Sequence, residues 1–171
     1  AGRQSLASTD RKEDGKRGKC PDIMFIEKYA RKLYELMFVK SSRLICLEQK
    51  KKDDKIKLWR EINDGMYYLH RNCRPDRNEF EILGIQVVGE MMHLNILIKD
   101  TDDIYQLYHR YSTRIPIQFT NSDNVIQFVN MLLVLRNILI INVSLLLHGP
   151  LVRSDRLKKR SSTIFSDSEN K

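Results

Sequence analysis

Cysteine is scarce in this chain, and its placement excludes two classes of small protein. The three cysteines, Cys20, Cys46 and Cys73, are odd in number, widely spaced and without a C-x-x-C pair. A disulfide scaffold needs paired cysteines, and a structural zinc site needs them at short spacing. The sequence therefore predicts reduced thiols in a cytosolic or nuclear protein, and nothing around Cys46 or Cys73 indicates a nucleophile.

An apolar leader is also lacking. Residues 1–19 are polar, so the sequence predicts an intracellular protein, in the nucleus or the cytoplasm, and not a secreted one. The first residue is Ala1 rather than methionine, which leaves open that the sequence is a fragment with upstream elements missing.

Long apolar runs are missing except near the end of the chain. Residues 131–147 are strongly apolar, but they are fewer than the roughly 20 that a membrane-spanning helix needs. They also include Arg136, Asn137, Asn142 and Ser144, and a charge at the centre of a bilayer is costly. We therefore expect a buried amphipathic helix and no membrane partner, with membrane association through this helix as a distant alternative.

Positive charge, by contrast, is in excess. The chain has 30 Lys and Arg residues against 22 Asp and Glu residues, a formal net charge of +8. Such a balance favours polyanions, either nucleic acid or an acidic membrane surface. The alternative is that basic tails carry the excess. Residues 1–18 are expected to form a disordered basic arm and residues 150–171 a disordered basic, serine-rich tail, with one domain at 19–149 between them.

Hydrophobic patterning within that domain predicts an α/β (α+β) fold, a mixed β-sheet flanked by helices in the order β-β-α-β-β-β-α. Strands are expected at residues 23–26, 33–39, 80–88, 92–98 and 104–108. A short edge segment is expected at 115–117, because Pro116 cannot donate to a ladder. Helices are expected at 48–69 and 123–147, the second capped by Ser122 and stopped by Gly149–Pro150.

The first expected helix combines an apolar face with many basic residues. Helical spacing relates its apolar residues, which are Ile56, Trp59, Ile62, Met66 and Leu69, so Trp59 is assigned to the core. The candidates to contact the backbone of DNA or RNA are Lys50, Lys51, Lys52, Arg71 and Arg74. His93 lies on the polar face of a later strand without a paired ligand, which favours a surface role over catalysis.

Motifs in the first half of the domain carry a resemblance to a known family. The segment from Gly18 reads GKCPDIMFIEKYARKLYELMFVKSSRLICLEQKKKDDKIKLWREINDGM. A Pro-Asp pair opens a strand, a second strand ends in a polar cluster, and a charged helix with DDKIKL follows. This is similar to uncharacterised fungal proteins with a PD-(D/E)XK, restriction-endonuclease-like core. Their pattern is a Pro-Asp strand, a strand ending in Glu-x-Ser or Glu-x-Lys, and a helix with D-x-x-K-L. The resemblance covers about residues 18–148, through GIQVVGEMMHLNILIKD and LLVLRNILIINVSLLL.

The resemblance implies a damaged magnesium site. In such a site an Asp and a Glu on adjacent strands bind Mg²⁺, which polarises the phosphate and activates water. Asp22 matches the first metal ligand, and Ser42 falls where a residue near the water is expected. Lys40 stands in place of the glutamate, and a cation there repels Mg²⁺. Glu35 is a poor replacement, because it is expected to face the opposite side of the strand.

We therefore expect a degenerate nuclease-like domain that is catalytically impaired. Its catalytic positions would be Asp22, Lys40 and Ser42, with Asp22 alone as a metal ligand and Mg²⁺ as the cofactor only if activity survives. Its expected partner is DNA or RNA. The alternative is a non-enzymatic protein-interaction domain of unknown role, and the sequence indicates neither a substrate nor an oligomeric state.

Overall fold

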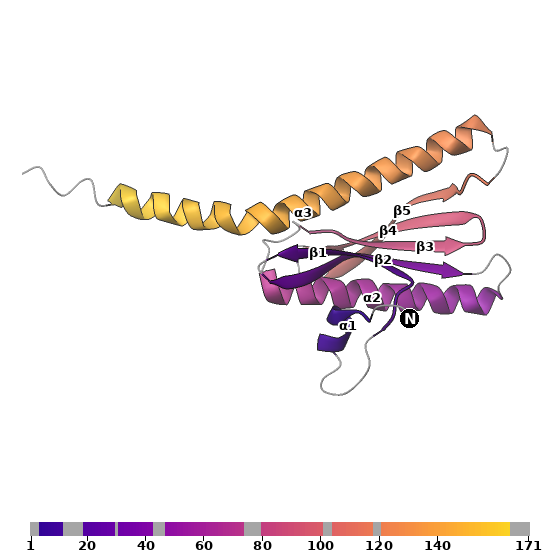
Figure 1. Cartoon of the computed structure of the whole chain (residues 1–171), viewed down its shortest axis with the longest axis horizontal. Coiled ribbons are helices and arrows are strands. Elements are labelled where there is room, and N and C mark those ends of the chain that lie inside the picture. The colour runs from indigo at the N-terminus through magenta and orange to yellow at the C-terminus, as the bar shows by residue number, and fades with distance from the viewer. Residues whose placement is uncertain are drawn as a thin grey trace, which may run out of the picture.

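The computed structural model describes residues 4–11, 19–29, 31–42, 47–73, 80–100, 104–117 and 121–164, with residues 73 and 149–164 described as helix only. A five-stranded mixed sheet lies between a helix on each face (Figure 1), which confirms the expected mixed α+β class. The elements in chain order are α1 (Leu6–Asp10), β1 (Ile23–Tyr29), β2 (Lys32–Ser42), α2 (Glu48–Cys73), β3 (Ile82–Val88), β4 (Met91–Lys99), β5 (Tyr105–Arg114) and α3 (Ser122–Ile164).

The strands follow one another across the sheet in the order β1-β2-β3-β4-β5. β2 and β3 are parallel, with α2 as their crossover, and the other neighbouring pairs are antiparallel. The β3–β4 hairpin turns at Gly89, whose φ of 59° suits a residue without a Cβ atom. The edge segment expected at 115–117 is wrong, since these residues form no strand. The Ile115 N–H instead donates to the Glu90 carbonyl at 2.7 Å.

Helix α2 closes the first of two apolar clusters. Buried side chains of α2 pack on residues that β2, β3 and β4 direct to this face of the sheet. Gly65 allows close approach of α2 to β2, because a Cβ atom there would lie 2.7 Å from the Phe38 ring. The buried members of this cluster are Tyr34, Leu36, Phe38, Leu58, Ile62, Met66, Leu69, Phe80, Ile82, Leu97 and Leu146.

Two residues that the sequence assigned to the core of α2 lie outside it. Ile56 is 49% exposed and Trp59 is 48% exposed. The buried arc of the helix runs instead through Leu58, Ile62 and Leu69. Ile56 and Trp59 therefore fall at its margins, where an apolar residue still fits helical spacing but meets no strand. The assignment of Trp59 to the core is wrong.

Helix α3 covers the other face of the sheet. The buried residues of the second cluster are Val39, Leu83, Ile85, Leu94, Ile96 and Met131. Asn142 anchors the helix to the start of β3, since its amide donates to the Glu81 carbonyl at 2.5 Å and its oxygen accepts from the Glu81 N–H at 3.2 Å. One polar residue of the apolar segment thus satisfies two backbone groups.

The side of α3 that faces away from the sheet is apolar and uncovered. By length and composition the segment Ser122–His148 could cross a membrane, with a hydropathy of 1.9 and 17% of its apolar window buried. The expected burial therefore holds only for the sheet-facing side. One such helix is weak support for a membrane span, and Arg136 lies exposed in its middle. The exposed apolar residues are Val125, Ile126, Val129, Leu132, Leu133, Ile140 and Ile141.

Helix α3 begins and ends differently from expectation. The side-chain oxygen of Asn121 accepts from the Asp123 N–H at 3.3 Å, so Asn121 rather than Ser122 caps the helix. The helix continues through Gly149–Pro150 to Ile164, so the stop expected at these two residues is wrong, and the disordered tail expected at 150–171 stays a prediction. A proline removes one backbone hydrogen bond and kinks a helix, but helix formers on both sides can continue it. Figure 1 shows α3 changing direction in its second half.

The N-terminal arm, expected to be disordered, contains helix α1. Ser5 and Ala7 are buried, and α1 lies beside α2 (Figure 1). The Glu35 carboxylate of β2 accepts from the Ser5 hydroxyl at 2.6 Å and from the Leu6 N–H at 2.7 Å. Composition does not reveal this helix, because the group that stabilises its N-terminus comes from a distant strand.

Candidate functional site

Asp22, which the resemblance predicts to be a metal ligand, lies beside the end of β2. Its N–H donates to the Val39 carbonyl at 3.1 Å, and its carboxylate accepts from the Ser41 N–H at 2.7 Å. Ile23 is the register partner of Val39, so Asp22 and Lys40 come next along the two antiparallel strands. Asp22 is exposed to solvent. The structure therefore brings together the two ends of the sequence motif.

Lys40 is buried and forms an ion pair with an acidic residue of α2. Its ammonium lies 3.1 Å from Glu61 Oε1 on α2 and donates to the Cys20 carbonyl at 2.9 Å. The sequence motif does not contain Glu61. A helical signal could have found it, because it lies three residues after Leu58 and next to Ile62, both buried. An acid at that position must face the sheet and needs a cation there.

Glu61 is poorly solvated for an ionised group. It is 1% exposed, and within the described part of the chain its Oε2 atom has no hydrogen-bond partner. Burial raises the pKa of Glu61, and the charges of Lys40 and Lys19 only partly offset this effect. The charge of Asp22 also raises it. Asp22, Lys40 and Glu61 therefore form one electrostatic cluster between β1, β2 and α2.

Ser42 is engaged by α2 rather than directed at a reacting centre. Its hydroxyl donates to the Asp54 carboxylate at 2.8 Å, and Lys50 and Lys57 lie 3.6 and 3.5 Å from the same carboxylate. Burial opposes ionisation of Asp54, but the Ser42 hydrogen bond and the two lysine charges outweigh it and lower the pKa of Asp54. The end of β2 is thus tied to the first turns of α2.

This arrangement does not fit a magnesium ion. In the residues that the structure describes, no group of three or more His, Cys, Asp and Glu side chains could hold a metal. The ammonium of Lys40 lies against Glu61, where a carboxylate pair would be needed, and repels a second cation. Glu35 cannot substitute, because its carboxylate is committed to α1. The expected facing of Glu35 also cannot be counted from sequence, since the β1–β2 register shifts there.

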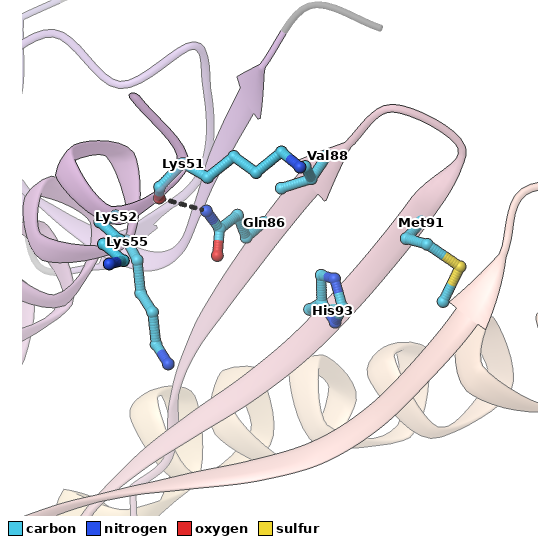
Figure 2. Close-up of a pocket in the computed structure, with 7 residues that line it drawn as sticks. All are labelled: Lys51, Lys52, Lys55, Gln86, Val88, Met91 and His93. Carbon is cyan, nitrogen blue, oxygen red and sulfur yellow. Dashed lines mark hydrogen bonds between the residues drawn. The ribbon is translucent and has the colours of Figure 1, made fainter. Parts of the chain in front are cut away.

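A lysine-lined hollow lies next to this cluster, between the first turns of α2 and the β3–β4 hairpin (Figure 2). Figure 2 shows the Lys51 side chain extending from α2 past Gln86 toward Val88, and the Lys55 side chain extending from α2 on the other side of Gln86. Gln86 connects the β3 side of the hollow to the α2 side, because its amide donates to the Lys51 carbonyl at 3.1 Å. The hollow has a volume of about 380 Å³ and is lined by Lys51, Lys52, Lys55, Gln86, Val88, Met91 and His93.

The floor of the hollow continues a polar row across the sheet. Register pairing sets Lys40 beside Gln86, Gln86 beside His93, and His93 beside Ser112. His93 Nδ1 and Ser112 Oγ are 2.7 Å apart, and Ser112 Oγ is 2.9 Å from His109 Nε2. Residues opposite each other in a sheet share a face, so the hollow and the Lys40 cluster lie on the same α2 side of the sheet.

Burial and nearby positive charge both act on the histidine of the hollow. Burial lowers the pKa of His93, and the charges of His109 and Lys55 lower it further. A phosphate group seated there would offset those charges and would accept hydrogen bonds from the lysines. The site is therefore suited to an anion.

The five basic residues predicted to contact nucleic acid divide into three groups. Lys51 and Lys52 line the hollow, although Lys51 also pairs with Glu48 at 2.6 Å. Lys50 and Arg71 are directed to Asp54 and Asp10 instead. Arg74 lies outside the described residues. Sequence reasoning did not place Gln86 and His93 in one site with the lysines of α2, because only the pairing of β2, β3 and β4 brings these two residues next to the helix.

Comparison with protein-family models, with curated proteins and with solved structures finds no match to this chain.

Proposed function

We propose that this chain is a degenerate PD-(D/E)XK nuclease-like domain that binds nucleic acid inside the cell through its phosphate backbone and does not cleave it. One observation carries the proposal: Lys51, Lys52 and Lys55 line one hollow together with His93, and the register pairs Gln86 of this hollow with Lys40. Lysine and histidine are suited to phosphate oxygens. Phosphate contacts read no sequence, so the proposed binding is sequence-independent.

The absence of cleavage in this proposal rests on Lys40. Its ammonium pairs with Glu61 at 3.1 Å in a buried position, so the second carboxylate needed for Mg²⁺ is replaced by a cation. The hydroxyl of Ser42, which would lie near the attacking water, donates a hydrogen bond to Asp54. The remaining acid, Asp22, is a single ligand on the surface.

The binding test compares a double charge reversal in the hollow with one elsewhere. Lys52→Glu/Lys55→Glu is expected to weaken binding of a DNA or RNA oligonucleotide about tenfold or more, and to flatten the slope of log affinity against log salt by about two. Fluorescence anisotropy at several salt concentrations measures both quantities.

The matched control is Lys28→Glu/Arg31→Glu. Both residues are exposed and lie at the β1–β2 turn, and this variant changes the net charge by the same amount. Equal weakening by the two variants would contradict a localised site and would leave only a general effect of net charge.

The cleavage test uses the chain as it stands with Mg²⁺ and labelled single- and double-stranded DNA. No cutting is expected. Metal-stimulated cutting that Asp22→Ala abolishes would contradict the proposal. Lys40→Glu alone is a poor test of whether cleavage can be restored, because it would place a second acid against buried Glu61. The double variant Lys40→Glu/Glu61→Lys is the better test, because it keeps one acid and one base in the pair.

The alternative, a non-enzymatic protein-interaction domain, is favoured by the uncovered apolar side of α3. Uncovered apolar surface of this kind marks contact sites for other macromolecules. Failure of the chain to bind any oligonucleotide at low salt would favour this alternative over nucleic-acid binding.

A further inference from the structure

Trp59 is placed as an external contact residue rather than as part of the core. It is 48% exposed and borders a second hollow of about 400 Å³ on α2. The other residues that line this second hollow are Arg11, Lys19, Arg60, Asn63 and Asp64. An indole half open to solvent presents a flat apolar surface that water solvates poorly.

Trp59 lies on the same side of α2 as two lysines of the first hollow. Lys52, Lys55 and Trp59 are spaced i, i+3 and i+7, which places them on one side of α2. At 1.5 Å per residue, Lys52 and Trp59 are roughly 10 Å apart along the helix axis. A ligand that follows the helix would thus meet lysines first and the indole next.

The charge around Trp59 is also positive. Arg11 and Lys19 each lie 2.8 Å from the single carboxylate of Asp64, so two cations share one anion. Arg60 is exposed beside them. An apolar ring bordered by net positive charge suits a ligand that has both flat aromatic groups and negative charges.

We propose that the ligand is single-stranded nucleic acid, with one base stacked on Trp59 and the neighbouring phosphates on Lys52 and Lys55. This inference rests on the proposed function and narrows its substrate class. Aromatic side chains combined with a cationic track are the usual means of binding single strands, because every base has a stacking face. In a duplex the faces of the bases are covered by one another, so Trp59 would have nothing to stack on.

The test uses the intrinsic fluorescence of the chain. Trp59 is the one tryptophan in the sequence, so tryptophan emission reports this site alone. Titration with single-stranded oligothymidylate is expected to quench the emission. A duplex of the same length and heparin, a polyanion without bases, are expected to bind without comparable quenching. Equal quenching by all three would overturn the inference.

Substitution separates stacking from charge. Trp59→Ala is expected to weaken single-strand binding about five- to a hundredfold, and Trp59→Phe is expected to retain most of the affinity. Ile56→Ala is the matched control, because Ile56 is 49% exposed on the same helix. Thermal melts of each variant establish that the fold is intact.

The outcomes distinguish this inference from the proposed function. If Lys52→Glu/Lys55→Glu weakens binding and Trp59→Ala does not, phosphate binding stands and stacking fails. If no oligonucleotide binds the unaltered chain, both fail. Preference for single strands that Trp59→Ala removes supports both.

Discussion

Lys40 and Glu61 form a buried ion pair whose two members are unequally hydrogen-bonded. Lys40 also donates to the Cys20 carbonyl, while Glu61 leaves one oxygen without a partner among the described residues. Taking two charges out of water costs several kcal/mol per ion, which their attraction only roughly repays. The pair is therefore expected to add little net stability, although removing one partner is costly.

At this site we predict opposite effects of single and double substitution. Lys40→Met is expected to lower the free energy of unfolding by about 3–5 kcal/mol, because it strands the Glu61 carboxylate, whereas Lys40→Met/Glu61→Leu is expected to match or exceed the unaltered chain. Denaturant unfolding at pH 7 measures both, with exposed Lys28→Met as control. A single variant as stable as the parent would contradict this account.

Asp54 gives a prediction for pH dependence. Its pKa is lowered below 3.8 in the fold, so its contribution to stability is present above pH 3.8 and is lost as the pH falls through the folded-state pKa. Asp54→Asn is expected to cost about 1.5–3 kcal/mol at pH 7, with the difference from the parent shrinking in acid. Urea unfolding from pH 2 to 7 measures this.

Neighbouring Asp53, which only accepts from Gln49 at 3.0 Å, provides the control through Asp53→Asn. A constant difference between Asp54→Asn and the parent at all pH values would show that the charge of Asp54 is not the cause. Glu61 affects the pH dependence of stability in the opposite direction. Its pKa is raised above 4.5 in the fold, so its ionisation opposes folding. The resulting loss of stability grows as the pH rises through the folded-state pKa.

For single residues, the sequence predicted which positions lie near each other better than it predicted which side chains they bind. The Pro-Asp and Lys-Ser-Ser spacing predicted the proximity of Asp22 and Lys40, because antiparallel neighbours follow from strand order. The strand spacing did not include Glu61 or Asp54, which lie on α2, and only the helical position of Glu61 next to Ile62 indicated an acid that faces the sheet. Trp59 was misplaced because helical spacing defines an apolar arc but not its centre.

Among the elements, α1 depends most on a partner distant in sequence. Five residues are too few to form a stable helix alone. Glu35 binds its first turn through the Ser5 hydroxyl and the Leu6 N–H, where a carboxylate also meets the positive end of the helix dipole. The carboxylate of β2 thus acts as a second cap next to Ser5.

We predict that Glu35→Gln releases α1 while the sheet stays folded. A neutral amide accepts these hydrogen bonds less strongly and cannot accept all of them at both of its terminal atoms. Amide hydrogen exchange at Leu6 and Ala7 is expected to accelerate by at least tenfold, with unchanged exchange in β3 and β4. Glu27→Gln on β1 is the control, and equal protection in both variants would refute the role of Glu35.

Long elements were predictable and short or irregular ones were not. The apolar runs of β3 and β4 are visible in the sequence because these strands bury residues on both faces of the sheet, and the charged α2 is visible because it buries one face. The α1 helix is held by contacts far away in sequence, and the passage of α3 through Gly149–Pro150 depends on the balance between one lost hydrogen bond and the helix formers around it. Neither can be read from local composition.

On the scale of the whole molecule, the two faces of the sheet differ in chemistry. The α2 side carries the lysine-lined hollow and Trp59, and the α3 side carries an uncovered apolar stripe. Net charge alone predicted a preference for polyanions, but it could not show that cations of α2 gather around His93. That arrangement depends on the parallel crossover from β2 to β3.

The sheet has two edge strands, and this affects whether two copies of the chain can pair through their sheets. Strands β1 and β5 each have one side without a partner strand among the described elements, which could template fibre-like growth by strand addition. Both pairings that involve an outer strand contain a register shift, and β5 exposes Arg110 and Arg114. An irregular backbone and like charges hinder a second copy of the chain from adding a strand to either edge of the sheet.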